Sequence, residues 1–129
     1  MREILFRGKR KLNGEWINGS LLVYGDGCCE ICVPDGYDAL DKFSVDPETV
    51  GQYTGLTDKN GKEIFEGDIV DILNENEETG VIEWAPGEAM FVISSDGWCA
   101  SFDNYWVNDV EIIGNIHDNP ELLGGADNG

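Results

Sequence analysis

The sequence has no lysine or arginine after Lys62. Residues 1–62 hold 8 basic and 10 acidic residues, whereas residues 63–129 hold 16 acidic residues and none that is basic. The second half of the chain therefore carries nearly all of the net charge of −18. A folded segment without cations cannot pair its carboxylates internally, so it must solvate them, bind metal through them or present them to a basic partner.

Long apolar runs are also missing. No run approaches the length of about 18 residues that spans a bilayer, and the basic N-terminus leads into an alternating pattern rather than the apolar core of a signal peptide. We therefore expect a cytoplasmic protein whose four cysteines are reduced thiols. The negative charge argues against direct binding to nucleic acid or to an anionic membrane, because both would repel it.

Recognisable catalytic groups are scarce as well. His117 is the single histidine, and neither a Gly-x-Ser-x-Gly segment nor a metal-binding helix motif is present. With 26 acidic residues in the chain, some pair of carboxylates looks suited to acid–base chemistry whatever the fold. The sequence thus predicts a protein that is not an enzyme and that has no cofactor.

The pattern that is present is that of β-strands. Apolar residues recur with a period of two, and no sustained helical stripe is visible. Asn13-Gly14 and Asn60-Gly61 predict tight hairpins in which both turn residues adopt positive φ. The strands that follow Gly67 and Gly80 indicate a strongly bent barrel. We predict an all-β fold, a small bent β-sheet or barrel, with an N-terminal β-hairpin subdomain and an SH3-like barrel element in the C-terminal half.

The hydrophobic content of 41% is sufficient for the core of one domain. We predict a single domain over residues 1–123, with an N-terminal part (1–56) and a C-terminal part (57–123). The last residues, 124–129, are rich in glycine and predict a flexible tail. Because the charge division at Lys62 falls inside a predicted hairpin, the acidic half is expected to be an ordered β unit.

Four residues have the chemistry of a zinc site. Cys29 and Cys32 have the C-x-x-C spacing of a zinc knuckle, and Cys99 with His117 would complete four ligands. However, the second pair is 18 residues apart, and positions 29 and 32 point to opposite faces of a strand unless a turn intervenes. Small buried or half-buried thiols are the simpler interpretation, so we predict no metal site.

One segment, Asp58-Lys-Asn-Gly61, resembles the start of a calcium loop. An EF-hand needs glycine at the sixth position and a bidentate glutamate at the twelfth. Glycine is fourth here, within a hairpin pattern, so a turn is the favoured interpretation.

Two groups of residues are candidates for binding a partner. The first is a run of carboxylates around residues 75–83, whose simplest role is solubility and whose more specific role would be to imitate nucleic-acid phosphates. The second belongs to a dense aromatic group that comprises Trp84, Phe91, Trp98, Phe102, Tyr105 and Trp106. Core packing is the simplest role of these rings, and an exposed pair beside carboxylates would be a protein-binding anchor. The candidate partner-binding residues are Glu75, Glu77, Glu78, Glu83, Trp98 and Trp106.

Four segments, taken in order, resemble the YopX family of small proteins encoded by bacteriophages and prophages. They are residues 6–9 with the Gly14-Glu-Trp16 and Gly19-Ser20 that follow, residues 46–55, residues 58–70 and residues 113–122. The resemblance implies an all-β fold and a phage or prophage origin, and it implies no activity. This chain has His117 where that family often has tyrosine or phenylalanine, which argues against a special role for the imidazole.

These observations lead to one expected function and two alternatives. We expect a non-enzymatic phage or prophage accessory protein, located in the cytoplasm of a bacterial host, that binds a protein partner such as a basic host protein through its acidic half. Mimicry of nucleic acid is one specific form of this function. The first alternative is a self-assembling structural β module whose copies join through residues 1–62, where the charge is nearly balanced. The second is a metal-binding protein or an enzyme with an unrecognised site.

Overall fold

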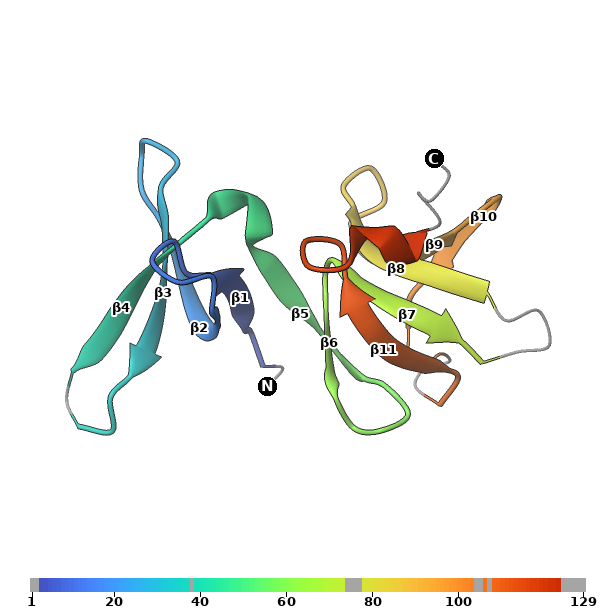
Figure 1. Cartoon of the computed structure of the whole chain (residues 1–129), viewed down its shortest axis with the longest axis horizontal. Coiled ribbons are helices and arrows are strands. Elements are labelled where there is room, and N and C mark those ends of the chain that lie inside the picture. The colour runs from blue at the N-terminus through green and yellow to red at the C-terminus, as the bar shows by residue number, and fades with distance from the viewer. Residues whose placement is uncertain (1–2, 38, 74–77, 104–105, 107, 124–129) are drawn as a thin grey trace. The chain divides into compact units, whose positions relative to one another are not determined.

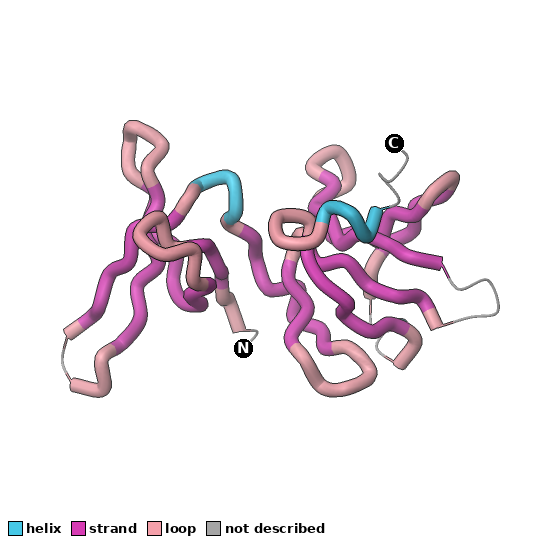
Figure 2. The backbone as a smooth tube through the Cα atoms, viewed as in Figure 1, coloured by secondary structure: helices cyan, strands magenta, loops and turns pink. Residues whose placement is uncertain are grey.

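The computed structural model describes residues 3–37, 39–73, 78–103, 106 and 108–123, and it divides into two compact units, Met1–Tyr53 and Thr54–Gly129 (Figure 1). The predicted tail, residues 124–129, lies outside the described residues. Both units are built of antiparallel strands (Figure 2), which confirms the all-β prediction. The described residues include no α-helix, and none of their short helices is long and apolar enough to cross a membrane.

The first unit is a sheet of consecutive antiparallel strands. Its strands are β1 (Phe6–Lys9), β2 (Trp16–Val23), β3 (Cys29–Pro34), β4 (Leu40–Val45) and the start of β5 (Gly51–Thr57). They lie in the order β4-β3-β2-β1-β5, and Phe6 pairs with Gly19 on one side and Gln52 on the other. β5 runs across the division between the units, and the boundary expected from the sequence, between residues 56 and 57, falls near the end of the same strand.

The end of β4 returns to the end of β1. The backbone N–H of Asp46 donates to the carbonyl of Lys9 over 2.8 Å, and that of Lys11 donates to Ser44 over 3.1 Å. Val45 packs over Gly8, where a Cβ atom would stand only 2.9 Å from Val45 Cγ2. The strands therefore curl around a small core of buried residues, namely Cys29, Ile31 and Val45.

The second unit contains a five-stranded sheet and the β5–β6 hairpin (Figure 1). Its further strands are β6 (Glu63–Phe65), β7 (Asp68–Ile72), β8 (Glu78–Ala85), β9 (Met90–Ser95), β10 (Trp98–Ser101) and β11 (Val110–Asn115). The sheet order is β10-β9-β8-β7-β11. One face of this sheet covers a larger apolar core, made of Ile64, Val70, Ile72, Ile82, Ile93, Phe102 and Val110. An SH3-like barrel in this half stays a prediction.

Two 3-10 helices accompany the strands, η1 (Pro47–Thr49) and η3 (Pro120–Leu123). The first lies between β4 and β5, and the second follows β11.

The Asn-Gly turns differ from the expected geometry. Gly14 and Gly61 have positive φ angles of 73° and 81°, but Asn13 and Asn60 do not. Asn13 instead accepts a hydrogen bond from the backbone N–H of Glu15 through its side chain. The tight turns predicted with two positive-φ residues are therefore wrong, because a side chain closes each loop: Asn13 in the first, and Asp58, which accepts from the N–H groups of Asn60 and Lys62, in the second.

Candidate functional site

The structure brings three of the six candidate residues together in the second unit. The rings of Trp98 and Trp106 stack with centroids 6.1 Å apart and planes 14° from parallel. The indole N–H of Trp98 donates to the carboxylate of Glu78, and that of Trp106 donates to the carbonyl of Ser101 over 3.0 Å. Both rings are half-buried against the apolar core, so this pair packs as part of the wall of the core.

The other candidates lie apart from that cluster. Glu83 is exposed on β8 and faces Val92 of β9. Since it is five residues from Glu78 on one strand, it points to the opposite face of the sheet. Glu75 and Glu77 lie outside the described residues. Contact of these residues with a partner stays a prediction.

The two units differ sharply in charge. The first unit has six basic and nine acidic residues, whereas the second has 17 acidic residues and two basic ones, Lys59 and Lys62. Many of the second unit's carboxylates are exposed, including Glu63, Glu83, Glu88, Asp96, Asp103, Asp109, Asp118 and Glu121. The ordered sheet therefore presents a field of one sign that the unit cannot neutralise by itself.

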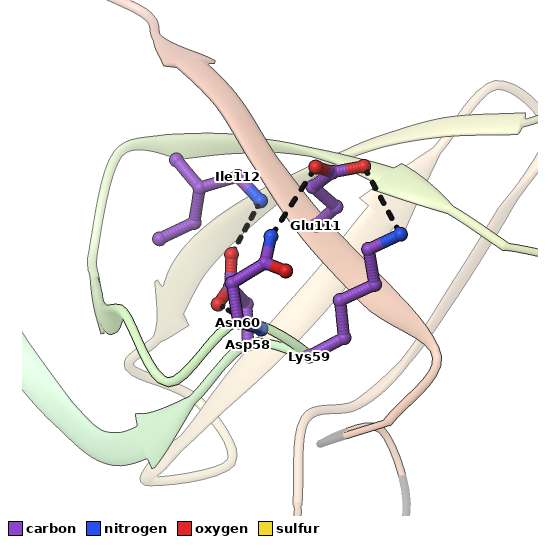
Figure 3. Close-up of polar contacts among 5 residues, drawn as sticks. All are labelled: Asp58, Lys59, Asn60, Glu111 and Ile112. Atoms are coloured by element: carbon purple, nitrogen blue, oxygen red, sulfur yellow. Dashed lines mark hydrogen bonds and ion pairs between the residues drawn. The ribbon is translucent and has the colours of Figure 1, made fainter.

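One of those two cations, Lys59, lies beside a pair of carboxylates that face each other across the sheet. Glu111 of β11 lies directly opposite Asp71 of β7, an arrangement that repulsion disfavours. Lys59 Nζ stands 3.6 Å from Glu111 Oε1, and Asn60 Nδ2 donates to Glu111 Oε2 over 3.2 Å (Figure 3). The hairpin turn thus offsets part of that repulsion.

Asp58 joins the same turn to β11. Its Oδ1 accepts from the backbone N–H of Asn60, and its Oδ2 accepts from that of Ile112 over 3.0 Å (Figure 3). Its Oδ1 also accepts from the backbone N–H of Lys62. Burial raises the pKa of this carboxyl, but the three N–H donors and the charge of Lys62 outweigh burial and hold its pKa below the usual value. Because its oxygens face N–H donors, Asp58 has the role of a structural anchor rather than of a calcium ligand.

The segments that resemble the family have structural roles in the second unit. Gly67, with φ of 93°, donates its N–H to Ile82 over 2.7 Å and accepts from Ile116 over 2.9 Å. The neighbouring Asp68 is 2% exposed and accepts from the N–H of Phe65 over 2.7 Å. The third and fourth segments are therefore joined through the glycine backbone.

Hydrogen bonds within the fourth segment, residues 113–122, close a turn. A Cβ atom at Gly114 would stand 2.5 Å from Asn119 Oδ1, the oxygen that accepts from the N–H of Asn115. The side chain of Asn115 in turn accepts from the N–H groups of His117 and Asp118. These polar residues hold a turn in which the backbone of His117 takes part.

A corresponding junction links the first and second segments within the first unit. The hydroxyl of Thr49, a buried residue of η1, accepts from the N–H of Lys9 over 2.9 Å and donates to the carbonyl of Asp46 over 2.6 Å. The carboxylate of Asp46 accepts from the N–H of Glu48, which caps η1.

The four residues considered as a zinc site are divided between the two units. Cys29 and Cys32 are buried in β3 of the first unit, whereas Cys99 and His117 belong to the second unit. Within the ranges that the structure describes, no three His, Cys, Asp or Glu residues are grouped as metal ligands would be. Hydrogen bonding to Asp26 raises the pKa of the exposed Cys28 thiol, which favours the thiol over the thiolate that metal binding or nucleophilic attack requires.

One exposed aromatic residue, Trp84, is not among the partner-binding candidates predicted from the sequence. Trp84 is 42% exposed at the end of β8, although strand alternation places it on the same face as Ile82, which is 0% exposed. Its ring meets that of Phe91 edge to face, with centroids 5.0 Å apart. The Pro86-Gly87 turn just beyond it was the available signal, because a residue beside a turn lies at the rim of a sheet.

Comparisons with known proteins agree on family and fold. A family model described as YopX protein matches residues 5–124. The crystal structure of protein EF1440 from Enterococcus faecalis is similar, with a TM-score of 0.63 and 24% identity over 95% of this chain and 99% of that chain. Protein yopX from Bacillus subtilis is also similar, with a TM-score of 0.57 and 18% identity over 95% of this chain and 97% of that chain. No curated protein matches the chain. At these identities the solved structures show a likeness of fold alone.

Proposed function

The chain belongs to the YopX family, and on this premise we propose that it is a non-enzymatic phage or prophage accessory protein that binds a basic protein in the cytoplasm of a bacterial host. The binding surface is formed by the exposed carboxylates of the second unit, which together we call its acidic face. A partner rich in lysine and arginine supplies the cations that this unit lacks.

The observation that carries the proposal is the separation of charge between two folded units. The second unit has 17 acidic and two basic residues, and its exposed carboxylates stand on strands and turns around a well-packed core. A field of one sign accelerates the encounter with a basic protein and discriminates against acidic ones. Carboxylates held at fixed spacings on a sheet are also what mimicry of nucleic-acid phosphates requires.

The test uses a basic bacterial nucleoid protein bound to fluorescent duplex DNA as the probe. We expect the chain to bind the nucleoid protein and to release the DNA at about 50 mM salt, and to do so much less at about 200 mM. A triple variant, Glu83→Lys, Glu88→Lys and Glu121→Lys, changes three exposed carboxylates of the second unit and should bind weakly.

A matched control separates the acidic face from net charge. The variant Glu3→Lys, Asp41→Lys and Glu48→Lys changes the charge by the same amount on exposed positions of the first unit, and it should bind almost as the parent does. Equal losses in the two variants would contradict the proposed surface, and so would absence of binding at about 50 mM salt. Binding without release of DNA would contradict mimicry of nucleic acid and would leave the binding of a basic protein standing.

A further inference from the structure

The β8–β9 hairpin carries an aromatic surface beyond the core of the second unit. Trp84 is 42% exposed and Met90 38% exposed, and Phe91 meets the Trp84 ring at an interplanar angle of 72°. The edge-to-face contact fixes the indole of Trp84, so binding of a partner would cost little conformational entropy of this side chain. Tryptophan is one of the residues enriched at the centre of protein–protein hot spots.

The turn of this hairpin is held in an unfavourable backbone conformation. Ala89 has φ of 53°, in the left-handed region that residues other than glycine avoid. The N–H of Glu88 donates to the carbonyl of Ala85 over 3.0 Å and closes the turn. Such strain persists where the surrounding structure imposes it, and it clusters at binding sites.

The first unit shows what covers comparable rings in this protein. Arg7 lies over the ring of Trp16 at 4.8 Å, and Arg10 lies over that of Phe43 at 4.7 Å. Among the described residues, the Trp84 ring contacts Phe91 and no cation. Because the chain has no lysine or arginine after Lys62, the second unit has few cations of its own to place there.

We infer that Trp84 is the docking point for an arginine or lysine side chain of the basic partner, with Glu88 of the adjoining turn as the carboxylate beside it. The inference rests on the proposed function and names the contact at its centre. A guanidinium within about 6 Å of an indole centroid is attracted by the ring, and arginine stacks on it better than lysine. Glu88 stands in the turn that follows β8 and is exposed, whereas Glu83, the neighbour of Trp84 on β8, points to the other face of the sheet.

The test is a titration of the isotopically labelled chain with a tetra-arginine peptide, followed by NMR of the four indole N–H signals. We expect the Trp84 signal to shift most, and the Trp16 signal to shift little because Arg7 already covers that ring. Trp84→Leu should weaken peptide binding about five- to thirtyfold, and Trp84→Phe should weaken it less. This loss should persist at high salt, where the attraction of the exposed carboxylates for the peptide is screened.

Two controls keep the result interpretable. Tyr37→Leu removes a ring that is 90% exposed on the first unit, and it should leave binding unchanged. Trp84 is absent from the buried core, so the thermal midpoint of Trp84→Leu should stay close to that of the parent.

The outcomes distinguish the inference from the proposed function. If Trp84→Leu binds the peptide as tightly as the parent while the triple Glu→Lys variant of the second unit does not, the docking point is wrong and the acidic surface stands. If the peptide does not bind at about 50 mM salt, where charge attraction is strong, both are overturned.

Discussion

The two units fasten a turn to a strand by the same device with different chemistry. In the first unit the neutral hydroxyl of Thr49 accepts the N–H of Lys9, and in the second the carboxylate of Asp58 accepts the N–H of Ile112. An ionised acceptor makes a stronger hydrogen bond than a neutral one, and it also makes the junction depend on pH. The second unit therefore uses negative charge for its own fold as well as presenting it.

The two units also differ in the size of their apolar cores and in where their cations lie. Among the described residues, the apolar cluster of the first unit holds three buried residues and cations lie over aromatic rings of that unit, whereas the apolar cluster of the second unit holds seven buried residues. A larger apolar core lets the second unit fold without internal charge balance, since burial of apolar surface is the dominant favourable term. The proposed use of its exposed carboxylates in recognition is therefore compatible with a stable fold.

The largest expected effect comes from matched cavities in the two cores. Ile31 and Ile93 are both 0% exposed, one in each unit. Replacing either with alanine should lower the free energy of unfolding by about 2–5 kcal/mol, because the cavity cannot close fully. Denaturant titration measures that loss, and amide hydrogen exchange locates it.

The strands in which amide exchange accelerates show whether the cores of the two units are independent. We expect Ile93→Ala to accelerate exchange mainly in the strands of the second unit, and Ile31→Ala to do so mainly in those of the first. Equal acceleration across both units in either variant would mean that the two cores act as one cooperative structure.

A smaller effect is expected from the two turn junctions. The pKa of Asp58 is lower in the folded protein than in the unfolded chain, so its contribution is complete above about pH 4 and is lost as pH falls through the folded value. Asp58→Asn should cost about 2 kcal/mol at pH 7 and progressively less on acidification below about pH 4. Urea midpoints of parent and variant at several pH values measure this difference.

Thr49→Val supplies the neutral counterpart. It should cost about 1 kcal/mol, and the cost should be the same at pH 7 and below pH 4, because a hydroxyl does not titrate in that range. A pH-dependent cost for Thr49→Val, or a constant one for Asp58→Asn, would contradict the contrast between the junctions.

The smallest effect concerns the strained hairpin of the second unit. Ala89→Gly should raise the free energy of unfolding by up to about 1 kcal/mol, because glycine adopts positive φ without steric cost. Ala39 of the first unit is an exposed alanine without positive φ, so Ala39→Gly should lower stability by about 0.4–1 kcal/mol. Thermal or urea unfolding measures both, and a loss of stability in Ala89→Gly would show that the turn is not strained.

Much of the fold was predictable, because it follows from local pattern. The period of two predicted an all-β fold, and the strand expected after Gly67 is β7. The turn geometry at the two Asn-Gly pairs was not predictable from those pairs, since it depends on which backbone N–H groups the side chains of Asn13 and Asp58 reach. Local alternation gives no clear sign of β4, because its polar residues Asp41, Lys42 and Ser44 are interrupted by the apolar Phe43.

The sequence by itself determined the strand content, the family and the separation of charge, because these depend on residue type and order along the chain. Only the tertiary structure decided which aromatic residues are covered and which polar residues serve the fold. Trp98 and Trp106 became a half-buried stack, while Trp84 stayed exposed at the rim of the same core. Asp58 became an anchor because Ile112, 54 residues away, brings its N–H to the carboxylate. Burial and hydrogen bonding arise from contacts between distant segments, and a local pattern does not specify them.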